Sequence, residues 1–273
     1  FREIHRLSED EHVGILNANG WTVAQYERLI GSDGELLKNV LERVILLLRD
    51  PEIPVRYEAA VAFRLLAVHE GGEVAAGGEG EGVVAEVPQI LESVLGLVEV
   101  CPNDEMVSAL EALIDRYPAA VAPRAVQVCA RLCETFLAHV QASASSGPAG
   151  QEVSSSKYRV LSGTMSALIG LLQALRAVPH MYAQVEGPLV HVVHTILSRR
   201  HEYVMEDQIV DAVEIINYLT FCAPSISDQM WQVFQLLVDT FVSGGGYDAI
   251  ENINSVVDNF IRRDTARFAA DPA

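Results

Sequence analysis

Apolar residues recur through most of this chain at intervals of three and four, the spacing of one face of an α-helix. Residues 34–49 are an example, with Leu37, Leu41 and Leu48 on the apolar side. Alternation with a period of two, which would indicate β-strands, is almost absent. A helix with one apolar face must bury that face against another element. The sequence therefore predicts an all-α protein of packed amphipathic helices.

Prolines and glycines divide the helical pattern into consecutive pairs. Pro51 and Pro54 end one helix and begin the next, because proline is tolerated only in a turn or in the first turn of a helix. Asn103 is a candidate N-cap. The predicted pairs are 34–49 with 55–69, 87–100 with 104–117, 118–140 with 158–177, 181–199 with 204–222, and 225–241 with 247–261.

The second helices of these pairs begin 43 to 53 residues apart. HEAT and armadillo repeats have periods of about 40–47 residues, so the spacing fits such units once loop insertions are allowed. We expect an α-solenoid of about five HEAT-type helical hairpins, a single segment over 1–273. The regular pairing argues against the alternative, a globular helix bundle. Segments 70–82 and 142–156 are predicted to be flexible loop insertions, and 1–33 has no clear assignment.

Composition limits the function classes. Half of the 273 residues are apolar, enough for a large core, and the net charge is −18. This charge disfavours direct nucleic-acid binding and makes a basic protein a plausible partner. The alternative is that acidity only keeps the chain soluble. No apolar run suits a membrane span, and no signal peptide is found. The missing initiator methionine leads us to expect a piece of a longer protein.

Catalytic patterns are weak. His191 and His194 lie three residues apart, near His201 and Glu202, but a metal site would need a further defined ligand. The four cysteines are predicted to be reduced and buried; these are Cys101, Cys129, Cys133 and Cys222. Cys129 and Cys133 share a helix face with His139 farther on, and this face looks buried, whereas a reactive thiol needs exposure. No phosphate-binding loop or nucleophile elbow is present. We expect neither an enzyme nor a cofactor.

Acidic residues are the more informative pattern. Residues 201–260 contain ten carboxylates and neither Lys nor Arg. Three predicted second helices carry carboxylates at helical spacing, which are Asp104, Glu111 and Asp115, then Asp207, Asp211 and Glu214, then Asp248, Glu251 and Asp258. Second helices line the concave side of HEAT solenoids, so we expect these rows to share one inner surface that binds a Lys/Arg-rich segment of a partner. The alternative is an ordinary polar face in an acidic protein. Helix 158–177 carries Arg159 and Arg176 but no carboxylate, and interrupts the track.

Residues 50–63 (DPEIPVRYEAAVAF) resemble the second helix of a HEAT repeat. More specifically, this stretch and two others resemble the importin 7/8 branch of the importin-β (karyopherin-β) nuclear transport receptors. Residues 103–117, running on into 119–136, are similar to the following repeats, and 225–231 (SISDQMW) is the closest local match. The likeness covers about 34–262 in the same order, departing at 5–33, 71–82 and 142–156. It implies a middle-to-C-terminal HEAT-repeat segment.

The resemblance implies import of basic cargo, such as ribosomal proteins and histones, through nuclear pores. It also implies cargo release by the GTP form of Ran, contacts with Phe-Gly nucleoporins, and shuttling between cytoplasm and nucleus. Ran is expected to bind through the full-length receptor, because in this superfamily its main contacts lie in N-terminal repeats. The alternative function is a HEAT scaffold subunit of a vesicle coat, a phosphatase or a chromatin assembly.

Overall fold

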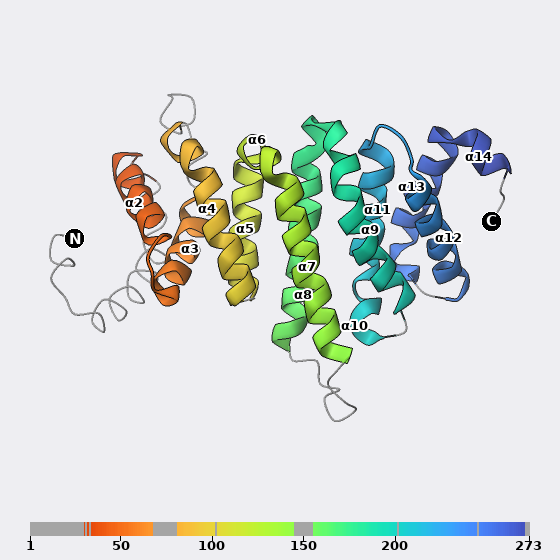
Figure 1. Cartoon of the computed structure of the whole chain (residues 1–273), viewed down its shortest axis with the longest axis horizontal. Helices are drawn as coiled ribbons and strands as arrows, with labels where there is room; N and C mark the ends of the chain where they lie inside the picture. Colours follow the sequence, from red (N-terminus) through yellow and green to blue (C-terminus); the bar gives the residue numbers. More distant parts are fainter. Residues whose placement is uncertain are drawn as a thin grey trace. The chain divides into compact units, whose positions relative to one another are not determined.

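The computed structural model describes residues 30, 32, 34–67, 81–101, 103–144, 155–200, 202–244 and 246–270. Within these ranges every regular element is a helix (Figure 1). The all-α fold class is confirmed. Residues 1–33, for which the sequence gives no clear assignment, lie almost wholly outside the described residues.

The chain divides into two compact units, one ending at Val121 and the other beginning at Ala122. The first unit contains two helical hairpins and a short following helix. Its helices are α2 (Gly34–Leu47), α3 (Ile53–Ala67), α4 (Glu81–Val100), α5 (Asp104–Arg116) and α6 (Pro118–Val121). Helix α2 pairs with α3, α4 pairs with α5, and α3 packs along α5, so the two hairpins stack.

Asn103 explains where α5 begins. Its side-chain oxygen accepts a hydrogen bond from the backbone N–H of Met106 at 3.0 Å, which confirms the predicted N-cap. Its amide nitrogen also donates to the hydroxyl of Tyr57 on α3 at 3.2 Å. One side chain thus starts α5 and links it to the second helix of the preceding hairpin.

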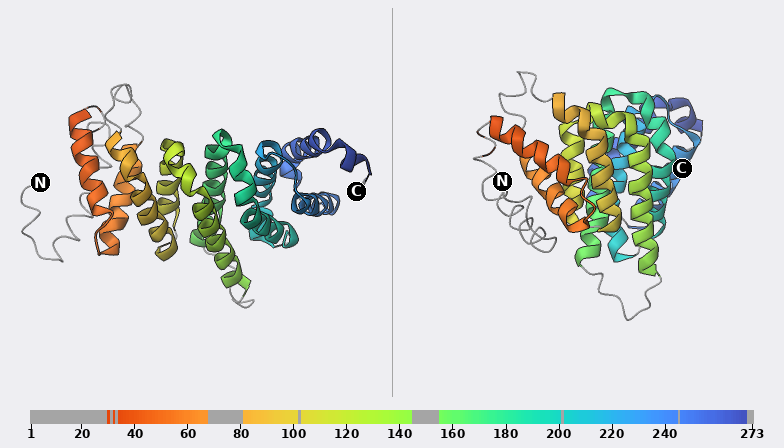
Figure 2. Two further views of the ribbon diagram at one scale, coloured as in Figure 1. Left: turned by 45° about the horizontal axis from the view of Figure 1, so that its top comes forward. Right: turned by 60° about the vertical axis from the view of Figure 1, so that its left-hand side comes forward.

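The second unit is also built from paired helices, which Figure 2 shows from two further directions. Its α-helices are α7 (Ala125–Ala144), α8 (Ser155–Ala174), α9 (Tyr182–Ser198), α10 (Tyr203–Glu206), α11 (Ile209–Cys222), α12 (Asp228–Val242), α13 (Ile250–Arg263) and α14 (Thr265–Ala270). Its 3₁₀ turns are η4 (Ala122–Arg124), η6 (Leu175–Ala177), η7 (Pro179–Met181) and η8 (Tyr247–Ala249).

The layers follow from which helices touch. First helices α7, α9 and α12 pack in succession, and second helices α8, α11 and α13 pack in succession behind them. Hairpin contacts join α7 to α8 and α9 to α11. This order is that of stacked HEAT-type hairpins, so the predicted α-solenoid class is confirmed within each unit. Whether 1–273 is a single solenoid segment stays a prediction.

Several predicted helix boundaries are wrong. Helix 118–140 divides at η4, which contains Pro123 and so lacks one backbone donor. Helix 204–222 divides after α10, where the backbone N–H of Gln208 bonds to Met205 in a tight turn. Helix α12 begins at Asp228, three residues later than predicted, because the hydroxyl of Ser227 accepts from the N–H of Met230 and caps it.

The predicted loop insertions are shorter than expected. Helix α4 already begins at Glu81, inside the predicted loop 70–82, and α7 and α8 occupy both ends of 142–156. Flexibility of the remaining loop residues stays a prediction, because they lie outside the described ranges. Helix α14 was not predicted at all, since its six residues are too few to show a helical period.

An aromatic cluster joins α12, α13 and α14. The ring of Trp231 lies 4.8 Å from that of Phe260, and Phe234 lies 4.4 Å from the same ring, measured between centroids. Phe268 of α14 contacts Trp231 and Phe234. The backbones of α12 and α13 do not lie close together, so the last hairpin is held by contacts between these large rings. The segment 225–231 therefore supplies Trp231 to the core of the end hairpin.

We predict that Phe260→Ala lowers the free energy of unfolding by about 3–5 kcal/mol, because it opens a cavity beside the rings of Trp231 and Phe234. Phe221→Ala removes a ring of the same size that is 60% exposed, and should cost less than about 1 kcal/mol. Urea denaturation of both variants measures the difference. Equal losses would show that the cluster does not carry the packing assigned to it.

Candidate partner-binding faces on the second helices

In the first unit, α5 carries two predicted carboxylates that the fold brings together. Glu111 is half-buried and Asp115, one turn later, is exposed. Burial raises the pKa of Glu111 above its ordinary value, and the charge of Asp115 raises it further. Asp104 begins α5, but its side chain is not among those described. The neighbouring Glu105 is already engaged with Arg64 of α3 at 2.7 Å.

In the second unit, Asp211 and Glu214 form a similar pair on α11. Burial raises the pKa of Asp211 to about 6, with a further contribution from the charge of Glu214. Asp207 does not continue this row as predicted. It is an exposed residue at the C-terminal end of the short helix α10, separated from α11 by a turn.

The third predicted row is also divided. Asp248 lies in η8, whereas Glu251 and Asp258 lie on α13. Asp248 and Glu251 are exposed. Asp258 is ion-paired with Arg262, one turn later, at 2.9 Å. The charge of Asp258 is therefore largely compensated inside its own helix, which makes it the weakest candidate of the row for holding a basic partner.

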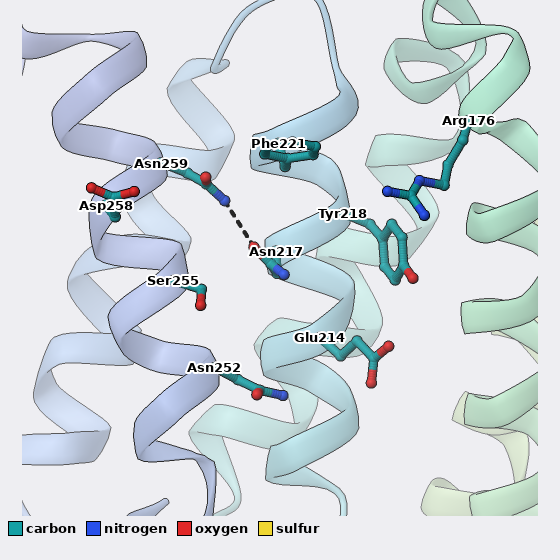
Figure 3. A pocket seen from close by; sticks show the side chains of 9 residues that line it. All are labelled: Arg176, Glu214, Asn217, Tyr218, Phe221, Asn252, Ser255, Asp258 and Asn259. Atoms are coloured by element: carbon teal, nitrogen blue, oxygen red, sulfur yellow. Dashed lines mark hydrogen bonds between the residues drawn. The ribbon is translucent and has the colours of Figure 1, made fainter.

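An open groove of about 490 Å³ lies on the second helices of this unit (Figure 3). The α11–α13 groove is lined by Arg176, Glu214, Asn217, Tyr218, Phe221, Asn252, Ser255, Asp258 and Asn259. Glu214 and Asp258 are thus the two predicted carboxylates that one cavity brings together. Arg176, which was expected only to interrupt the acidic track, lines the same groove.

A hydrogen-bond network fixes the centre of the groove. The amide nitrogen of Asn259 donates to Thr220 at 3.1 Å and to the side-chain oxygen of Asn217 at 2.8 Å. Asn259 is only 8% exposed, so its position is set by these bonds and by packing. The two asparagines connect α11 directly to α13.

Arg263 secures the end of the same pair of helices. From α13, its Nη1 donates to the backbone oxygen of Thr220 at 2.8 Å and its Nη2 to that of Pro224 at 3.0 Å. Phe221 and Ala223 oxygens accept from the same guanidinium. One cation thereby satisfies carbonyl groups that the end of α11 leaves without intrahelical partners. The groove walls are consequently held at a fixed separation.

Sequence reasoning missed the asparagines of the groove. Asn217, Asn252 and Asn259 carry no charge and match no motif. A weak signal was present, because asparagine is a poor helix former and yet Asn217 and Asn259 occupy helix interiors. Only the packing of α13 on α11 shows that Asn217 and Asn259 face each other.

Within the described residues, the structure does not bring the histidines and cysteines of the predicted patterns together into a site. His191 and His194 are exposed on α9, and Glu202 is bonded to Arg199 at 2.7 Å, while His201 is not described. Across the described residues, no three His, Cys, Asp or Glu side chains are grouped as a metal ion would require.

Cys129 and Cys133 are buried, as predicted, and the hydrogen bond with Cys129, together with burial, raises the pKa of Cys133. Cys101 and Cys222 are partly exposed, which corrects the expectation that all four are buried. None of the described helices combines the length and the apolarity that crossing a membrane requires.

Comparison with known proteins gives a consistent set of relatives. The chain is 24% identical to "Importin beta-like SAD2 homolog" of Arabidopsis thaliana, over 91% of this chain and 22% of that protein. It is 24% identical to "Probable importin-7 homolog" of Dictyostelium discoideum, over 93% of this chain and 22% of that protein. It is 22% identical to mouse "Importin-8", over 96% of this chain and 24% of that protein. These relatives are importins.

The predicted resemblance to the importin 7/8 branch is thus confirmed, at low identity and over nearly the whole chain. The chain spans less than a quarter of the length of each of these importins. No protein-family model matches the chain. No solved structure matches it either.

We predict that Asp211→Asn stabilises the chain near neutral pH. In the folded state the pKa of Asp211 is raised from 3.8 to about 6, so its contribution to stability is full below about pH 3.8 and lost as pH rises through about 6. A neutral asparagine avoids that loss, by ~1 kcal/mol once solvent screening is included.

Thermal unfolding at several pH values measures this effect. The gain should be present at about pH 7.5 and absent near pH 4. Asp207→Asn is the matched control, because Asp207 is exposed, and should leave stability within ~0.5 kcal/mol. A gain from Asp211→Asn that does not change with pH would contradict the assignment of this raised pKa to Asp211.

Proposed function

We propose that this chain is a segment of an importin-β-type nuclear transport receptor that binds basic protein cargo on its second helices. One observation carries the proposal. Of the nine predicted carboxylates, Asp104 has no described side chain and Asp258 is ion-paired, which leaves seven. None of these seven has an ion pair within the described ranges.

Carboxylates without an ion pair, on second helices in each of the two units, are a physical reason to bind cations. Glu111 and Asp115 repel each other, as do Asp211 and Glu214, and this repulsion helps to raise the pKa of Glu111 and of Asp211. A Lys or Arg side chain from a partner would remove the repulsion and form charge-assisted hydrogen bonds. The net charge of −18 would also attract a basic partner over long range.

The names of the relatives support transport over a general scaffold, since all three are described as importins. In the proposed receptor, Ran-GTP binding to other repeats would release the cargo, and Phe-Gly nucleoporins would carry the complex through the pore. The receptor would accordingly shuttle between cytoplasm and nucleus. The chain would contribute binding and not catalysis.

We predict that the double variant Asp115→Lys/Glu251→Lys weakens binding of a linker histone about tenfold at about 50 mM salt. Both side chains are exposed on second helices. The matched control is Glu42→Lys/Asp239→Lys, which makes the same charge change at exposed positions on first helices α2 and α12. Fluorescence anisotropy measures both affinities.

The affinity of the control variant for the histone should fall by less than about threefold. Raising the salt to about 300 mM should weaken histone binding by the unchanged chain at least about tenfold. Equal losses in the two double variants would mean that net charge alone attracts the histone. Absence of salt-dependent binding to the unchanged chain would overturn the proposal for this segment.

We also predict that histone binding weakens as pH falls through about 6. A bound Lys or Arg favours the ionised form of Asp211, so protonation of this carboxyl, whose pKa is raised to about 6, opposes binding. Between about pH 7.5 and pH 5, the histone affinity of the unchanged chain should fall about threefold more than that of the Asp211→Asn variant. Identical pH dependences of histone binding for the unchanged chain and Asp211→Asn would show that Asp211 does not contribute to binding.

A further inference from the structure

The α11–α13 groove differs in chemistry from the acidic face around it. Asp258 is paired with Arg262, and the groove lining contains one further carboxylate, Glu214, and one further cation, Arg176. The groove therefore presents nearly balanced charge, and its centre is made of asparagine side chains. Charge attraction of the kind proposed above does not explain such a surface.

The orientation of each central amide follows from the hydrogen-bond network. The hydroxyl hydrogen of Thr220 is donated to backbone oxygens, chiefly that of Ile216 at 2.8 Å, so its oxygen can only accept from Asn259. The atom of Asn259 facing Thr220 and Asn217 must then be the NH₂ group. Asn217 consequently turns its oxygen toward Asn259.

Two polar groups are left over by this arrangement. The NH₂ group of Asn217 and the side-chain oxygen of Asn259 have no hydrogen-bond partner among the described residues, and both side chains line the groove. Farther along α13, the amide of Asn252 likewise has no partner within those residues (Figure 3). One donor and one acceptor, fixed on neighbouring helices, complement the carbonyl and the N–H of an extended peptide unit.

The rest of the lining suits the side chains of the same peptide. Tyr218 and the 60% exposed ring of Phe221 offer apolar surface. Arg176 has no ion pair or hydrogen bond in the described part of the chain, and it can pair with an acidic side chain. Glu214, which has no ion pair there either, can accept a Lys or Arg side chain.

We infer that the α11–α13 groove binds an extended polypeptide segment of a partner through its main chain, with an acidic side chain at Arg176 and a basic one at Glu214. The inference builds on the proposed function in that the ligand is again a protein. It adds a second site, which binds main-chain groups together with one acidic and one basic side chain. A partner segment that is merely rich in Lys and Arg would not match this site.

The test uses the 273-residue chain, immobilised, and a pool of synthetic twelve-residue peptides composed of Ala, Ser, Leu, Glu and Lys. Retained peptides are identified by mass spectrometry. We expect enrichment of sequences that contain both Glu and Lys at a fixed spacing. Asn217→Leu should reduce their retention about tenfold, and Gln232→Leu, an exposed position on α12, should leave it unchanged.

Two further measurements separate main-chain recognition from recognition of side chains alone. N-methylation of one backbone amide of a retained peptide should weaken binding about tenfold, and methylation of its neighbours should have little effect. The Arg176→Glu variant should retain peptides that have Lys at the one position where peptides retained by the unchanged chain have Glu. Asn217→Asp serves as a second variant if Asn217→Leu lowers the melting temperature, since it keeps the size of the side chain and removes the donor.

The inference is overturned if the chain retains no peptide, if Asn217→Leu and Asn217→Asp retain the same peptides as the unchanged chain, or if no single N-methylation weakens binding. Its failure is distinguishable from failure of the proposed function. Asn217→Leu should keep salt-dependent histone binding, and Asp115→Lys/Glu251→Lys should keep peptide retention, which should change less than about threefold between about 50 and 300 mM salt.

Discussion

Burial of one apolar face by each long helix is the constraint on which the structure depends. In α13 the buried residues are Ile253, Val256, Asn259 and Phe260, and they meet α11 and the rings of α12. Since one side of the helix is committed to these neighbours, its other side must be polar. The same condition on α5 in the first unit and on α11 in the second leaves each of these second helices with a polar side that a partner can reach.

Two kinds of polar surface result from this arrangement. Glu111 with Asp115, and Asp211 with Glu214, are carboxylate pairs that repel each other and have no ion pair within the described residues. Around Asn217 the surface is nearly neutral and is organised by amide hydrogen bonds. The first kind favours basic proteins of many sequences, whereas the second can select a particular extended segment. A surface that accepts many basic proteins and a groove that selects one kind of segment would thus lie side by side on α11.

The sequence predicted the helices well because their signal is local. Apolar spacing located α2, α3 and α5, and Asn103 marked a helix start to the residue. The divisions after Glu206 and around Pro123 were missed, because apolar spacing continues across a short turn. The candidate site was harder. Acidic residues are visible in a sequence, but the pairing of Asn217 with Asn259 depends on contacts across 42 positions.

Contact between carboxylates of the second helices and a basic partner is the central claim, and carboxyl footprinting measures this contact directly. The chain would be labelled with a carbodiimide and an amine, with and without linker histone, and each carboxylate read by mass spectrometry. We predict protection of Asp115, Glu251 and Glu214, with unchanged labelling of Glu42, Glu134 and Asp239 on the first helices. Protection spread equally over first and second helices, or confined to the first helices, would contradict the claim.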